Sequence, residues 1–210
     1  MRRKLLLAIL AAPLAAYLIL VPLRQGLREM GTDFPNYYTA AVLTRQHQPL
    51  RQFYEWAWFQ RQIDYTGIGH QLGSYVPHTP LTMIPLLPLS GLAPQRAKQI
   101  WVLVQVVLLI ASILLLARLT GLGKLEMTVL ALLAYPALSS NFRLGQYYIL
   151  ILFLLACAAW CLLRGREAAG GVLMGVIFAL KLYTAPFAFY FAARRQWKAL
   201  AGFPAAATAA

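Results

Sequence analysis

The sequence predicts an all-α protein that crosses a membrane several times, and two observations lead to this fold class. Hydrophobic residues make up 60% of the 210 residues and charged residues 12%, with a mean hydropathy of +0.62, which is too apolar for a soluble globular domain. The apolar residues also gather in runs of about the length that a helix needs to cross a bilayer core. We therefore expect a polytopic membrane protein.

The charge balance is strongly basic, with 19 Lys and Arg against 6 Asp and Glu and a net charge of +13. In a membrane chain such an excess marks cytoplasmic loops and contacts with lipid headgroups. No nucleic-acid-binding motif is visible, so we expect membrane lipids as partners and no nucleic acid. Cys157 and Cys161 lie one helical turn apart in an apolar run, where packing is the expected role and a disulfide or metal site is the alternative.

The first apolar run covers residues 5–23 and follows three basic residues. We predict that it is a retained first span with a cytoplasmic N-terminus, because no small-residue cleavage site follows it. Residues 24–98 then form a long loop, which we expect on the extracytoplasmic side. In this loop, residues 52–62 (QFYEWAWFQRQ) predict an interfacial helix, and the proline-punctuated residues 81–93 predict a re-entrant segment.

The segment 31–41 (GTDFPNYYTAA) follows the first span. Its apolar and aromatic residues have helical spacing, which predicts a short amphipathic helix at the membrane surface. Asp33 would lie at the N-terminal turn of this helix. Two roles for that turn stay open at this point: Thr32 or Asp33 caps the helix, or the carboxylate takes part in chemistry.

Further apolar runs predict spans over residues 95–117, 125–138 and 147–163, with a turn at residues 139–146 on the outer face. Residues 170–191 allow two versions. One is a continuous span that places Lys181 near mid-membrane, and the other is a helix broken around residues 181–186 that leaves by the face it entered. A new run starts at about residue 198 and the sequence ends inside it, so we expect the N-terminal part of a longer protein.

No nucleotide-binding glycine loop, zinc-ligand spacing or serine elbow is present in the sequence. What remains is a set of polar side chains that the predicted topology brings toward the outer membrane face. These are Asp33, Asp64, His70, His78, Arg143, Gln146 and the intramembrane Lys181.

Four motifs in a fixed order carry a family resemblance. They are DFPNYYTAA after the first span, YVPHTPLTMIPLLPLSGLAPQRAKQIW before the second, LGQYYILIL at the fourth and GVLMGVIFALKLYTAPF in the fifth. Together they resemble glycosyltransferase family 87, which belongs to the C-type (GT-C) membrane glycosyltransferases and includes polyprenyl-phosphate-mannose-dependent α-1,2-mannosyltransferases. The resemblance implies a GT-C-like helix bundle in the cell (inner) membrane. It also implies a polyprenyl-phosphate sugar donor, with mannose as the sugar, and a lipid or glycan acceptor at the extracytoplasmic face.

The resemblance implies that Asp33 is the catalytic base, which accepts the proton of an acceptor hydroxyl while that oxygen attacks the anomeric carbon with inversion. Arg143, Lys181 and His78 are then candidates to bind the departing phosphate, and Gln146 and Tyr37 complete the expected substrate site. Each of these residues also has an alternative role, which stays open. Arg143 anchors to headgroups, Lys181 snorkels to the membrane surface, His78 is an ordinary loop residue, and Gln146 forms hydrogen bonds with backbone groups.

No cofactor is expected beyond the lipid-linked donor, because the DFP motif lacks the second carboxylate of a metal-binding pair. The main rival to a glycosyltransferase is a transporter or flippase, in which Lys181 and broken helices would line a path. A structural membrane anchor is a third reading. The long loop with two predicted surface helices and a single aspartate near the first span favours the enzyme.

Overall fold

The computed structural model describes residues 2–69 and 71–208, and the regular elements in that part of the chain are helices. The predicted all-α class is therefore confirmed. The chain divides into two compact units, one made of Met1–Pro77 with Met83–Ile149 and the other of His78–Thr82 with Leu150–Ala210.

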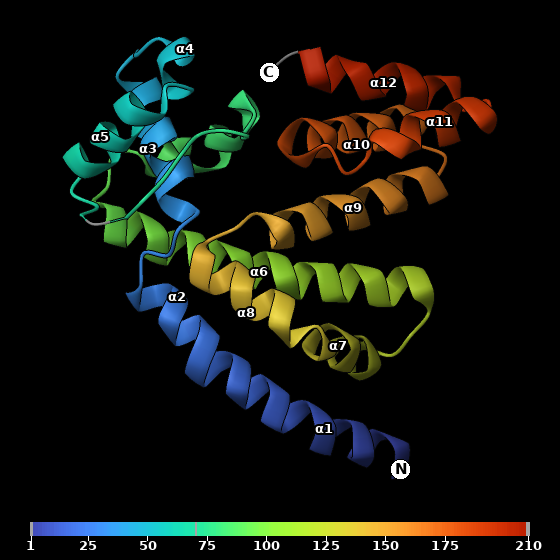
Figure 1. The fold of residues 1–210 in the computed structure, drawn as a ribbon. Coiled ribbons are helices and arrows are strands. Elements are labelled where there is room, and N and C mark those ends of the chain that lie inside the picture. Colours follow the sequence, from blue (N-terminus) through green and yellow to red (C-terminus); the bar gives the residue numbers. More distant parts are fainter. Residues whose placement is uncertain (1, 70, 209–210) are drawn as a thin grey trace. The chain divides into compact units, whose positions relative to one another are not determined.

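Two long apolar helices belong to the first unit. The helices α1 (Arg2–Leu18) and α2 (Arg24–Arg28) join through the π-helical segment η1 (Ile19–Leu23) into one continuous rod, and α6 (Pro94–Thr120) is the longest single helix (Figure 1). Pro22 lies inside η1, where its missing N–H removes one helical hydrogen bond and favours a local change of pitch. The rod and α6 are 27 residues each, which by length and composition is enough to cross a bilayer.

The apolar run at residues 125–138 differs from the single span that was predicted. It contains α7 (Lys124–Leu133) and the first part of α8 (Tyr135–Leu144). Pro136 lies in the first turn of α8, where its missing N–H needs no partner, so α7 ends and a new helix begins. The predicted turn at 139–146 is consequently shorter, since α8 continues to Leu144.

The helix α3 (Phe34–Arg45) is present as predicted, but it is not a surface helix of this unit. Nine of its twelve residues are buried, including small and polar ones such as Asn36, Thr39 and Ala40. The aromatic spacing was read correctly as helical. The amphipathic interpretation was wrong because small side chains on the opposite side allow close packing there too.

Two short helices, α4 (Leu50–Phe53) and α5 (Trp56–Tyr65), follow α3. The helix α5 has a buried side and an exposed side, because Phe59 and Ile63 are buried whereas Trp56 is 59% exposed. Phe53, Phe59 and Tyr75 form an aromatic cluster with ring centroids 5.6 to 6.3 Å apart. The proline-rich segment forms the 3-10 helix η2 (Pro80–Leu89).

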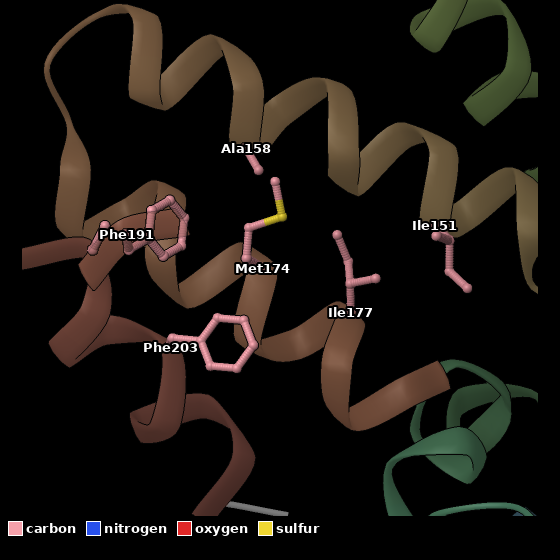
Figure 2. Packing of buried hydrophobic residues seen from close by; sticks show 7 residues of the cluster. Ile151, Ala158, Met174, Ile177, Phe191 and Phe203 are labelled. Carbon is pink, nitrogen blue, oxygen red and sulfur yellow. The ribbon is translucent and has the colours of Figure 1, made fainter. Parts of the chain in front are cut away.

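The second unit is built from α9 (Tyr148–Leu163), which begins in the first unit, and from α10 (Glu167–Lys181), α11 (Ala185–Ala193) and α12 (Trp197–Thr208). Side chains of all four helices meet in one apolar cluster (Figure 2). In this view Ala158 of α9 points toward Met174 of α10, and Phe203 of α12 lies beside them. The cluster comprises Ile151, Ala158, Met174, Ile177, Phe191, Ala199 and Phe203.

Glycines set the distance between α10 and α12. A Cβ atom at Gly171 would lie 2.0 Å from the carbonyl oxygen of Ala199, and one at Gly202 would lie 2.7 Å from that of Ala168. The two helices therefore touch backbone to backbone, the mode of packing that small residues permit between membrane helices.

The segment 170–191 contains the break that the second of the two predicted versions requires. The helix α10 ends at Lys181, Leu182 adopts a left-handed conformation with φ of 39°, and α11 begins at Ala185. The buried hydroxyl of Thr184 donates to the carbonyl oxygen of Met174 at 2.7 Å, which holds the broken turn against α10.

Candidate active site

The turn before α3 lies against the end of α8 in the first unit. Gly31 has a φ of +70°, and a Cβ atom there would lie 2.5 Å from the carbonyl oxygen of Arg143 and 2.9 Å from the Cα of Leu144. Only glycine meets both demands without strain. The chain is therefore guided past the α8 terminus immediately before it reaches Asp33.

Asp33 occupies the N-cap position of α3, but its side chain makes no capping hydrogen bond. Instead, the Nε2 of Gln146 donates to the Oδ2 of Asp33 at 2.5 Å, across 113 positions of sequence. The hydroxyl of Thr32 is a weaker neighbour at 3.4 Å from Oδ1. Both Asp33 and Gln146 are half-buried, so the carboxylate is held in place while part of it stays accessible.

Lys98 joins the two segments that carry this pair. It is fully buried on α6, and its Nζ donates to the carbonyl oxygens of Met30 at 3.3 Å and Arg143 at 3.1 Å. The ammonium also lies 5.3 Å from the centre of the Phe34 ring and interacts electrostatically with the carboxylates of Asp33 and Glu29. A buried amine needs such partners. Here two of them are main-chain oxygens in the segments that precede Asp33 and Gln146.

Two further side chains of α6 bind the turn between α8 and α9. The indole Nε1 of Trp101 donates to the carbonyl oxygen of Gly145 at 3.2 Å, and the Nε2 of Gln105 donates to that of Gln146 at 2.8 Å. Asn141 in turn donates to the Oε1 of Gln105 at 2.7 Å. The backbone of the turn is thus fixed from α6, which orients the Gln146 side chain toward Asp33.

Aromatic residues close to Asp33 and Gln146 in the sequence form ring stacks. Tyr37 is fully buried and its ring stacks on that of Tyr147 with centroids 4.2 Å apart, and Trp101 meets the Tyr147 ring edge-on at 5.2 Å. Phe34 stacks on Tyr38 at 5.7 Å. The Tyr38 hydroxyl donates to the carbonyl oxygen of Leu92 at 2.6 Å, and burial raises the pKa of this phenol.

The predicted site residues fall into different parts of the chain. Asp33 and Gln146 are in contact, Arg143 is exposed at the end of α8, and Tyr37 is buried in the ring stack with Tyr147. Lys181 and His78 belong to the second unit. Asp64 lies on α5, within 3.4 Å of the amide nitrogen of Gln60, and His70 lies outside the described residues.

Sequence reasoning missed Lys98, Trp101 and Gln105. Lys98 was counted among the basic residues of the loop, because a charge next to an apolar run is usually assigned to its flank. The available signal was the spacing, since positions 98, 101 and 105 lie on one side of a helix. Polar side chains repeated at that spacing in an apolar helix indicate an internal partner.

Within the described residues, no three His, Cys, Asp or Glu side chains lie together in a way that would hold a metal ion. The chemically distinctive feature is instead a single accessible carboxylate fixed by one amide. Such a group is suited to accept a proton from a hydroxyl within hydrogen-bonding distance.

The chain was compared with known proteins. No curated protein and no solved structure matches it. The sequence profile of glycosyltransferase family 87 matches residues 75–210, which include Lys98, Trp101, Gln105 and Gln146, whereas Asp33 precedes the matched region. Because this match covers more than half of the sequence, the chain belongs to glycosyltransferase family 87 and is a membrane glycosyltransferase.

Proposed function

We propose that the protein transfers a sugar, mannose by the family resemblance, from a polyprenyl-phosphate donor to a lipid or glycan acceptor, with Asp33 as the general base. The observation that carries the proposal is the hydrogen bond from Gln146 to Asp33. An aspartate at a helix N-cap ordinarily binds the backbone N–H groups of its own helix. Asp33 does not, so its carboxylate is available to a substrate.

The proposed step is a single displacement. The acceptor hydroxyl oxygen attacks the anomeric carbon, the bond from that carbon to the phosphate oxygen breaks, and its electron pair leaves with polyprenyl phosphate. The hydroxyl proton passes to Oδ1 of Asp33, the carboxylate oxygen that Gln146 does not bind. One carboxylate is enough for this inversion, and the proposed step includes no metal ion.

The departing phosphate needs cationic or hydrogen-bonding partners. We assign Arg143 to this role in the first unit, because its side chain is exposed at the end of the helix that leads to Gln146. Lys181 and His78, which belong to the second unit, stay predictions from the sequence, and Tyr37 contributes through its ring stack with Tyr147.

We also propose the orientation of the chain. The basic residues Arg2, Arg3 and Lys4 precede the first apolar rod, which favours a cytoplasmic N-terminus by the positive-inside rule. The rod would then deliver Asp33 to the extracytoplasmic face of the cell membrane. Family membership favours this enzyme over the transporter considered from the sequence.

The test compares Asp33→Asn with the wild type in nanodiscs, using radiolabelled polyprenyl-phosphate mannose and a glycolipid acceptor. We expect transfer to fall about 100-fold or more, in the range seen for loss of a general base. Asp64→Asn is the matched control, because Asp64 is exposed on α5 and should leave the rate unchanged. Full activity of the Asp33 variant would remove this residue from the mechanism.

A further inference from the structure

A second concave site exists in the first unit, on the same helix as Asp33. It is a cavity of about 350 Å³ whose walls are the C-terminal half of α3, the end of α5 and the turn that leads into α6. This volume is within the range of sites that bind small molecules. Six of the side chains that line it carry the argument: Tyr38, Val42, Gln46, Gln62, Thr66 and Ser90.

The lining of this cavity combines polar, uncharged side chains with apolar ones. Gln46 and Gln62 contribute amides, and Thr66 and Ser90 contribute hydroxyls that already donate to the carbonyl oxygens of Ile63 and Leu87, both at 2.7 Å. Those hydroxyl oxygens keep lone pairs that can accept. The guanidinium of Arg45 lies against Gly91 but does not line the cavity.

The cavity begins about one and a half helical turns along α3 from Asp33. Tyr38, Val42 and Gln46 follow one another at four-residue spacing, which places them on one side of the helix, and Tyr38 stacks on Phe34 next to Asp33. At about 1.5 Å of rise per residue, the cavity extends from roughly 7 to 20 Å from Asp33 along the helix axis. A chain of several sugar units could therefore occupy the cavity with one end at Asp33.

We propose that this cavity is a subsite for a neutral sugar unit of the acceptor, remote from the unit that is glycosylated; this rests on the proposed function. Sugars combine hydroxyls, which donate and accept hydrogen bonds, with apolar C–H faces. The cavity offers both kinds of partner, since amides and hydroxyls alternate with apolar residues such as Val42 and Leu92. A phosphate group favours a cationic partner, and none of the side chains that line this cavity is cationic.

The experiment has a binding arm and a kinetic arm, both on the full chain in nanodiscs. The binding probes are fluorescently labelled linear trisaccharides of mannose, glucose and galactose, measured by fluorescence anisotropy. We expect at least one to bind the wild type, and Gln46→Leu and Gln62→Leu each to weaken it by about 3- to 10-fold, the loss of one or two hydrogen bonds. Gln48→Leu is the matched control, because Gln48 is exposed nearby and does not line the cavity.

In the kinetic arm, the two cavity variants should raise the acceptor KM for trisaccharide glycolipids and leave it unchanged for monosaccharide glycolipids. Binding of no trisaccharide, or equal loss with Gln48→Leu, would overturn the subsite. Tighter binding of a sulfated trisaccharide, abolished by Arg45→Gln, would also overturn it, because the site would then prefer an anionic ligand. The proposed function fails separately, if Asp33→Asn retains transfer while the cavity variants still lose trisaccharide binding.

Discussion

The Nζ of Lys98 donates to the carbonyl oxygen of Arg143 at 3.1 Å, although the two residues are 45 positions apart. The same nitrogen donates to Met30. One buried lysine side chain thereby connects the turn that precedes Asp33 with the turn that carries Gln146, and the relative position of the two side chains depends on it.

Lys98→Met should lower kcat by tenfold or more while changing the substrate KM values little. Methionine fills a similar volume but removes the hydrogen bonds to the carbonyl oxygens of Met30 and Arg143, each of which contributes about 0.5–1.5 kcal/mol. Amide hydrogen exchange should become faster at residues 30–34 and 143–146 together. Lys124→Met is the control, because Lys124 is exposed at the start of α7, and unchanged exchange in both turns of the Lys98 variant would contradict the connecting role.

Gln146→Leu should reduce transfer by about 10- to 100-fold, because a hydrogen bond to a charged group contributes about 1.5–3 kcal/mol. Since Gln146 acts through Asp33 in this view, the double variant with Asp33→Asn should be no slower than Asp33→Asn alone. Steady-state rates of the four proteins form the double-mutant cycle. Additive losses would show that Gln146 acts independently of Asp33.

Gly145 and Gly165 form a natural comparison. Both have left-handed backbones, with φ of +75° and +72°, but a Cβ atom at Gly145 would lie 2.6 Å from Lys98 Nζ and 2.7 Å from Phe34 Cβ, whereas nothing lies within 4 Å at Gly165. Alanine at either position should cost about 1–2 kcal/mol from the backbone. Only Gly145→Ala should also abolish most transfer, which activity and thermal unfolding measured side by side will show.

Gly171→Ala should destabilise the second unit. In a free helix this change would stabilise by up to about 1 kcal/mol, but here the new methyl group meets the carbonyl oxygen of Ala199. We expect overpacking of about 1–3 kcal/mol and a lower midpoint of thermal unfolding in detergent. Gly69→Ala, where nothing lies within 4 Å, should leave the midpoint unchanged, and a rise in stability of the Gly171 variant would refute the close contact of α10 and α12.

The sequence allowed the helical class and the place of Asp33 at the start of a helix to be predicted, and it offered the break after Lys181 as one of two versions, because each depends on local pattern. Hydropathy shows an apolar run directly, and an aspartate or a Pro186-marked break is visible within a few residues. The partnership of Asp33 with Gln146 depends on contact across 113 positions, which spacing does not reveal. The role of Lys98 was hidden for the same reason, since only the folded chain shows that its carbonyl partners surround it.

The burial of α3 and the division between α7 and α8 were harder still. Small residues such as Ala40 and Thr39 look equally compatible with solvent, lipid or a packed interior, so their pattern did not reveal that both sides of α3 are covered. Pro136 was read as the end of a span, when it begins the next helix. In each case the packing of neighbouring elements, which one sequence does not display, determined the result.

The three donors of α6 bind main-chain oxygens of Arg143, Gly145 and Gln146, so they do not read the side chains at those positions. The backbone conformation of the turn between α8 and α9 is for that reason independent of which side chain stands at position 143. Replacing Arg143 would alter the charge offered to a substrate while the scaffold that holds Gln146 against Asp33 stays intact. Under the role proposed for Arg143, this is the position at which donor preference can be redesigned without rebuilding the fold.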